Sequence, residues 1–223
     1  MARLTRLAPV DGTPDIRPMS SPIWKQQIVA FHEQLVRERG EGWGAFWGSP
    51  ASQRGRYEIF FRELPLRNSD VLEVGCGFGD FLDIAREKDA LPRRYLGVDL
   101  SPAIVAAAQR SHPDAEFASL DILADDPPFA PDFVIASGIM AVDVPDYEAY
   151  TLAILRRFYA LSRGGFALNF LSSCSEKPDG RSRYVDPGWL LSLFQRQIDW
   201  RCRLLHDYRS NDFTLVYQRP ASP

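Results

Sequence analysis

The chain has 223 residues, a hydrophobic fraction of 45%, a charged fraction of 25% and a formal net charge of −3. These values are ordinary for a globular protein with one main domain, and they exclude the broad basic field that disposes a surface to bind nucleic acid. The three cysteines show no metal-ligand spacing, so we expect reduced thiols and no metal site. No apolar run reaches membrane-spanning length, and the first residues lack a signal-peptide core, so we expect a cytoplasmic protein.

The first part of the chain predicts an arm and a helical cap. Four prolines near the start favour an irregular arm. Apolar residues then recur at helical spacing from Ile23 to Val36, and Gly40 follows where that helix would end. We therefore expect an N-terminal arm and cap over residues 1–52 and the main domain over residues 53–223.

A stretch rich in glycine and aromatic residues follows the cap helix. Residues 41–50 place Trp43 and Trp47 among three glycines and a proline, which predicts a loop that buries aromatic rings. In one interpretation this loop clamps the cap to the core, and in the other it covers a bound ligand. A second helix is expected at about residues 53–63.

The stretch from Asp70 to Asp80 organises the rest of the chain. A short apolar strand runs into Gly75, Gly77 and Gly79, after which a helix begins. Glycine has no Cβ, so the backbone can turn tightly and a ligand can approach it closely. The free N–H groups of the following helix would point at that ligand. This pattern predicts a nucleotide-type site, although Glu73 within the strand would disfavour a pyrophosphate.

After the glycine turn, strands and helices alternate. Strands are expected at 95–99, 115–120, 132–136 and 166–171, helices at 79–88, 102–110, 147–161 and 187–198, and two final strands at 200–206 and 213–218. Asp99 ends the second strand, 20 residues after Gly79, where a carboxylate can accept hydrogen bonds from both ribose hydroxyls. This order predicts a mainly parallel sheet with helices on both faces.

The segment Val71-Leu72-Glu73-Val74-Gly75-Cys76-Gly77-Phe78-Gly79 resembles the first motif of the class I S-adenosylmethionine-dependent methyltransferases. The resemblance extends over about residues 53–219. It implies an α/β fold, namely a doubly wound, seven-stranded, Rossmann-like sheet with an antiparallel C-terminal hairpin and an N-terminal helical cap. The implied cofactor is S-adenosyl-L-methionine. It has no phosphate and carries a sulfonium cation, so a carboxylate near the loop suits it better than it suits a dinucleotide.

The resemblance also implies a set of cofactor-binding residues. Asp121, at the end of the third strand, matches an acid that accepts from the adenine amino group. Ser137, after the fourth strand, lies where the family places the methyl group and the amino-acid tail. Arg56 or Tyr57 can reach the cofactor's carboxylate, and Trp47 can form an aromatic wall over the sulfonium. The full expected set is Trp47, Arg56, Tyr57, Glu73, Gly75, Cys76, Gly77, Gly79, Asp99, Leu100, Asp121, Ile122, Ser137 and Gly138.

No catalytic base stands out in the sequence. The sulfonium already provides the leaving group, so a general base is needed only when the acceptor requires one. The candidates are Tyr57, Ser137, Tyr184 and His206. The stretch after the fourth strand lacks an Asn/Asp-Pro-Pro-Tyr/Phe motif, which argues against amino methylation of adenine or glutamine. The absence of a Pro-Cys pair argues against cytosine C5 methylation.

Three function classes follow from these patterns. The leading one is a methyltransferase acting on a small-molecule acceptor, as a monomer or homodimer, with nucleic acid disfavoured as a partner. The chain is also similar to the group of enzymes that cyclise S-adenosylmethionine to azetidine-2-carboxylate and methylthioadenosine. The third class is a cofactor-binding subunit without catalysis, against which the acids Glu73, Asp99 and Asp121 weigh.

Overall fold

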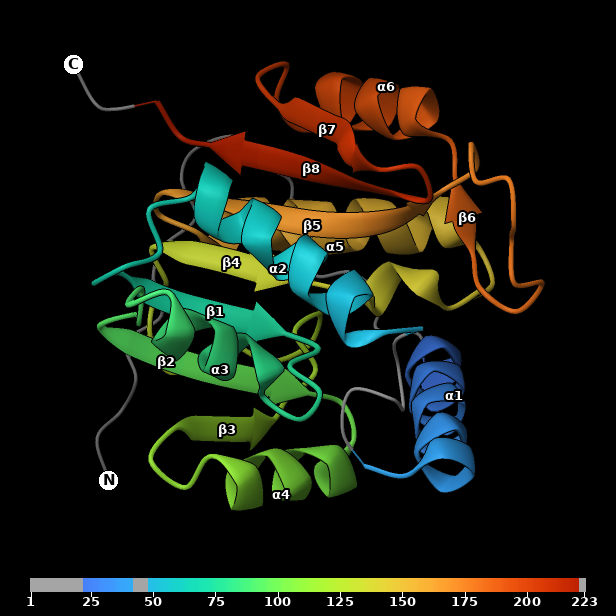
Figure 1. Ribbon diagram of the computed structural model, residues 1–223. Coiled ribbons are helices and arrows are strands. Elements are labelled where there is room, and N and C mark those ends of the chain that lie inside the picture. Colours follow the sequence, from blue (N-terminus) through green and yellow to red (C-terminus); the bar gives the residue numbers. More distant parts are fainter. Residues whose placement is uncertain (1–21, 42–47, 221–223) are drawn as a thin grey trace.

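The structure of the protein is a computed structural model that describes residues 22–41 and 48–220, and its centre is a twisted sheet with helices on both faces (Figure 1). The main path of the sheet runs in the order β3 (Glu116–Ser119), β2 (Arg94–Asp99), β1 (Asp70–Val74), β4 (Phe133–Ala136), β5 (Gly165–Ser172), β8 (Asp212–Gln218) and β7 (Arg203–Arg209). The first five are parallel, whereas β8 is antiparallel to both β5 and β7. The expected doubly wound sheet with a C-terminal hairpin is confirmed.

The central strands are apolar because both of their faces are covered. On β1, Val71 packs with α2 (Pro50–Glu63) and α3 (Asp80–Glu87), whereas Leu72 and Val74 face the opposite cluster. That second cluster includes side chains of α5 (Tyr147–Leu161) and α6 (Pro187–Gln197). Helix α4 (Pro102–Ser111) packs against β2 and β3. The alternation along β1 therefore assigns each side chain to one face of the sheet.

Local sequence signals set the starts of several helices. Ser49, Ser101 and Asp186 each accept a backbone N–H at the first turn of α2, α4 and α6, and a proline follows each of them. Helix α2 consequently begins at Pro50, three residues earlier than predicted from its apolar spacing.

Helix α1 (Pro22–Arg39) is the predicted cap, and it lies beyond the C-terminal ends of β1 and β2 (Figure 1). Ile28 of α1 is buried in the main core. Trp24 Nε1 donates to the carbonyl of Pro145 at 2.7 Å, and Ser101 Oγ donates to Glu33 at 2.9 Å. These contacts fix the helix over the edge of the sheet. The loop that holds Trp43 and Trp47 lies outside the described residues.

Two segments near the C-terminus differ from the prediction. The stretch after β5, where no strand is predicted, contains β6 (Tyr184–Val185), which pairs with the end of β5 beyond β4 and gives the sheet an eighth strand. The final hairpin turns at residues 210–211, because β7 continues past a bulge to Arg209. His206 therefore lies within β7 and not at its end. Within the described ranges, no helix combines the length and hydropathy needed to span a bilayer.

Candidate active site

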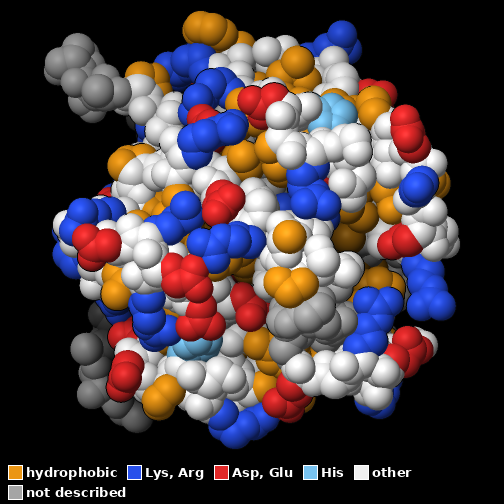
Figure 2. Space-filling view, viewed as in Figure 1, with side chains coloured by type: hydrophobic (Ala, Val, Ile, Leu, Met, Phe, Trp, Pro, Cys, Tyr) orange, Lys and Arg blue, Asp and Glu red, His pale blue; other side chains and the backbone are white. Residues whose placement is uncertain are grey.

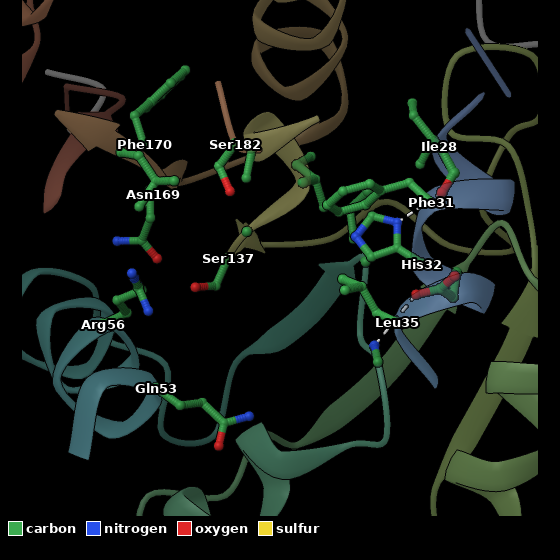
Figure 3. Close-up of a pocket in the computed structure, with 18 of the residues that line it drawn as sticks. Ile28, Phe31, His32, Leu35, Gln53, Arg56, Ser137, Asn169, Phe170 and Ser182 are labelled. Atoms are coloured by element: carbon green, nitrogen blue, oxygen red, sulfur yellow. Dashed lines mark hydrogen bonds between the residues drawn. The ribbon is translucent and has the colours of Figure 1, made fainter. Parts of the chain in front are cut away.

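A cavity of about 520 Å³ lies at the C-terminal ends of the parallel strands, between α1 and α2 (Figure 3). Ligands of open α/β sheets bind at this edge, where the strand order reverses. Here the reversal falls between β1 and β4. Figure 3 shows Ile28, Phe31 and Leu35 of α1 on one side of the cavity, with Arg56 and Asn169 on the other.

The glycine turn forms the floor of the cavity. Gly75 and Gly77 line it with φ values of 71° and 55°, a region that favours glycine. The backbone N–H groups of Gly75 and Cys76 donate to the carbonyl of Val98 at 2.8 and 3.0 Å, which ties the turn to β2. A Cβ on Gly75 would collide with the side chain of Ile139. The turn therefore needs glycine at both positions for conformation, and at Gly75 also for space.

Two of the predicted acids reach the cavity. Asp99 accepts hydrogen bonds from the backbone N–H of Gly77 at 3.4 Å and of Ser101 at 3.1 Å. Burial raises the pKa of the Asp99 carboxyl, and these N–H groups, together with the nearby His32, oppose that rise. Asp121 lines the cavity from the loop after β3 and accepts from the backbone N–H of Leu123 at 3.1 Å.

The third acid, Glu73, lies beneath the cavity and not in its lining. Its side chain is fully buried and accepts hydrogen bonds from the hydroxyls of Tyr57, at 2.9 Å, and Tyr95. Burial raises the pKa of Glu73 to about 8 despite these two donors. Tyr57 itself lines the cavity. Glu73 therefore fixes the position of a cavity residue without bordering the cavity itself.

Arg56 enters the cavity as part of a buried ion-pair cluster. Its guanidinium bonds Asp212 Oδ1 at 2.6 and 3.0 Å and Ser52 Oγ at 2.9 Å. Asp212 is completely buried, and its second oxygen lies 3.1 Å from Nε of Arg209. The cluster of Arg56, Asp212 and Arg209 joins α2 to the final hairpin at the end of the cavity remote from Asp99.

The structure brings most of the predicted residues into one lining. These are Arg56, Tyr57, Gly75, Cys76, Gly77, Asp99, Leu100, Asp121, Ile122, Ser137, Gly138 and Tyr184. Gly79 caps α3 outside the lining. His206 is also outside it, with Nε2 3.3 Å from the carbonyl oxygen of Ser210, so its placement gives no support to a role as base. Trp47 lies outside the described residues.

Sequence reasoning missed several lining residues. Asp212 lies just before the last expected strand, and its partner Arg56 is 156 positions away, so no local pattern links them. Asn169 did carry a signal, since it is the single polar residue in the apolar run of residues 166–171. The apolar face of α1 follows from its helical spacing, but the local sequence does not show that this face packs over the cavity.

Comparison with known proteins decides the family. The family described as "Methyltransferase domain" matches residues 71–165. The chain is 32% identical over 161 residues to Rv1506c of Mycobacterium tuberculosis, whose name is that of a methyltransferase, with 67% of this chain and 92% of that protein covered. The chain belongs to the class I S-adenosylmethionine-dependent methyltransferases. Its cofactor is S-adenosyl-L-methionine, and the expected enzyme class is confirmed.

Further relatives agree with this assignment. Trans-aconitate 2-methyltransferase of Escherichia coli O157:H7 is 30% identical over 187 residues, covering 72% of this chain and 71% of that enzyme. Among solved structures, the DhpI–SAM–HEP complex superposes with a TM-score of 0.65 at 20% identity, covering 91% of this chain and all of that one. Magnesium protoporphyrin IX methyltransferase from Synechocystis PCC 6803 gives a TM-score of 0.62 at 14% identity, covering 88% of this chain and all of that one. These relatives lend no support to the cyclase or the non-catalytic class.

Proposed function

We propose that this methyltransferase acts on a small-molecule acceptor that shares the described cavity with the cofactor. One observation carries the proposal. The cavity contains the glycine turn and Asp99. It continues past Ser137 to a second set of polar side chains, which includes Asn169 of β5 and Asp212 of β8. A cofactor bound at the glycine turn and Asp99 leaves the second set of polar side chains available to another small molecule.

The cofactor end of the cavity fits S-adenosyl-L-methionine. Gly75 and Gly77 line the cavity without side chains, so a ligand there can approach the backbone of the turn. Asp99 is the residue for the ribose hydroxyls, because its carboxylate lines the cavity at the end of β2. We assign Asp121 and Ile122, which also line the cavity, to the adenine edge, and α1 contributes apolar side chains to the same lining.

The chemistry divides between cofactor and protein. When bound, the cofactor supplies an electrophilic methyl group on a sulfonium, which is its own leaving group. The protein's task is to hold the acceptor in line and to exclude water. Ile28, Phe31 and Leu35 of α1 contribute the apolar wall for that exclusion. Tyr57, anchored by Glu73, and Ser137 lie in the lining, where either can contact a reacting group.

A small organic acceptor agrees with the relatives and with the surface. Trans-aconitate, the acceptor in the name of the Escherichia coli relative, is a small carboxylate. On the face shown in Figure 2, basic and acidic side chains are intermixed and form no continuous basic field of the kind that tracks nucleic acid. The division of the chain at residue 52, the cytoplasmic location and a monomeric or homodimeric state stay predictions of the sequence.

The product formed from the cofactor tests this proposal. The protein is incubated with S-adenosylmethionine alone and then with trans-aconitate and other small carboxylic acids, and the nucleoside products are separated by chromatography. We expect S-adenosylhomocysteine only when an acceptor is added. Steady release of methylthioadenosine from the cofactor alone, above its spontaneous rate, would instead refute methyl transfer and favour cyclisation.

A further inference from the structure

Besides Asp212 Oδ2, which is ion-paired with Arg209, two buried side chains that line the cavity have oxygen atoms without hydrogen-bond partners among the described residues. They are Ser137 Oγ and Asn169 Oδ1, and their residues are only 5% and 2% exposed. Buried polar atoms are almost always paired, so an orphaned pair that lines a cavity indicates that a ligand or water completes it. Figure 3 shows the Ser137 hydroxyl and the Asn169 amide pointing toward the same space.

Strand register explains why these two residues are neighbours. Ala136 of β4 pairs with Leu168 of β5, so the next residues, Ser137 and Asn169, follow on one face of the sheet. Adjacent strands are about 4.8 Å apart, and three such steps separate β5 from β2, so Asn169 stands about 14 Å from Asp99. The orphaned oxygens therefore lie away from the ribose end of the cavity.

The hydrogen bonds of the Asn169 amide orient its oxygen toward the cavity. Its Nδ2 donates to Thr214 Oγ1 at 2.6 Å and to the Tyr208 hydroxyl at 3.3 Å, and Tyr208 and Thr214 bond each other at 2.8 Å. Both hydrogen bonds of the amide nitrogen therefore go to the hairpin, and Oδ1 is left as an acceptor for a ligand. Such a site requires a donor on the ligand, an O–H or an N–H.

Several basic side chains line the same cavity as this acceptor. The cluster of Arg56, Asp212 and Arg209 carries one more cation than anion. Lys177 and Arg181 also line the cavity, and neither has an ion pair within the part of the chain that the structure describes. Asp179, the acid between them, accepts from the backbone N–H groups of Arg181 and Ser182, and the charge of Arg181 helps to lower its pKa. This end of the cavity therefore favours a ligand with a negative charge beside its donor.

We propose that Ser137 and Asn169 form the acceptor subsite, and that the acceptor is a small hydroxycarboxylate. Its hydroxyl donates to Asn169 Oδ1 and contacts Ser137 Oγ, while its carboxylate faces Arg209, Lys177 and Arg181. Thr214 is a positioning residue, since it holds the amide of Asn169 with the oxygen inward. This inference rests on the proposed function, because it assigns the second ligand of the same cavity.

The test compares acids with and without a hydroxyl on protein saturated with S-adenosylhomocysteine, which has no methyl group to transfer. Calorimetry measures the affinities of malate against succinate, citrate against tricarballylate, and 4-hydroxyphenylacetate against phenylacetate. We expect at least one pair in which the hydroxylated acid binds about tenfold tighter, because its partner leaves buried polar atoms unpaired. Equal or absent binding within all three pairs would overturn the proposal.

Variants locate the preference at this subsite. Asn169→Leu should reduce the preference to less than about threefold, and Thr214→Val should reduce it partly by freeing the amide to turn. Thr151→Val is the matched control, because Thr151 is a buried threonine whose hydroxyl bonds the carbonyl of Tyr147 outside the cavity lining. This control should retain the full preference. Retention of the preference in Asn169→Leu would overturn the assignment.

Binding of S-adenosylhomocysteine distinguishes a failure of the proposed function from a failure of the acceptor-subsite assignment. If the wild-type protein does not bind it, the proposed function itself fails. If Asn169→Leu keeps its thermal melting temperature but binds S-adenosylhomocysteine more than about threefold more weakly, the subsite belongs to the cofactor's amino-acid tail. In that case the acceptor assignment is wrong while methyl transfer stands.

Discussion

Replacing the buried Glu73 by glutamine should change how the stability of the protein depends on pH. Glu73 has an ordinary pKa of 4.5, which burial raises to about 8 in the folded chain. Between these values the folded state keeps a proton that the unfolded state has lost, so the free energy of unfolding falls as the pH rises. Below pH 4.5 both states are protonated, and the full contribution is present.

The structure sets the size of this effect. Within the window the free energy of unfolding changes by about 1.4 kcal/mol per pH unit, so about 2 kcal/mol is lost between pH 6 and pH 7.5. Glutamine cannot ionise, but its carbonyl can accept from one tyrosine and its amide can donate to the other hydroxyl oxygen. Glu73→Gln should therefore keep Tyr57 and Tyr95 paired while it removes this loss.

Urea unfolding at pH 6 and pH 7.5 measures the change. We expect wild type to lose about 2 kcal/mol more than Glu73→Gln over this interval, with equal denaturant slopes. Glu58→Gln is the control, because Glu58 is a surface residue paired with Arg54 and should keep the wild-type dependence on pH. If wild type and Glu73→Gln lose the same free energy over this interval, Glu73 does not retain its proton and our reasoning about its burial is wrong.

Three further substitutions test the site and its support. Gly77→Val should abolish binding of S-adenosylmethionine in a folded protein, and unchanged affinity in calorimetry would contradict the role of the glycine turn. Asp99→Ala should weaken cofactor binding at least tenfold, since a hydrogen bond to a charged group contributes about 1.5–3 kcal/mol; a change below about threefold would leave Asp99 only its bonds to the turn. Arg56→Met should lower the free energy of unfolding by about 3–5 kcal/mol, because Asp212 would stay buried without its main partner; a loss below about 1 kcal/mol in urea unfolding would contradict that account.

The sequence alone determined the parallel sheet and the cofactor turn. Both depend on signals that are local along the chain. Alternating glycines after an apolar strand require one tight turn, and an acid at the end of the next strand lies beside it in any parallel arrangement. Serine or aspartate before proline likewise set the starts of α4 and α6, and the same signal at Ser49 marks the start of α2, which apolar spacing alone placed three residues late. Neighbouring residues fix these features, so they could be predicted without knowing the tertiary structure.

Only the tertiary structure decided how the rest of the cavity is built. Glu73 was expected at the cofactor, but the pairing of β1 places its side chain under α2, between Tyr57 and Tyr95. The ion pair of Arg56 with Asp212 and the bond of Asn169 to Thr214 join residues 156 and 45 positions apart. Strand register and helix packing bring such partners together. Both are determined by the burial of apolar surface over the whole chain. The local sequence around either partner therefore does not predict the contact.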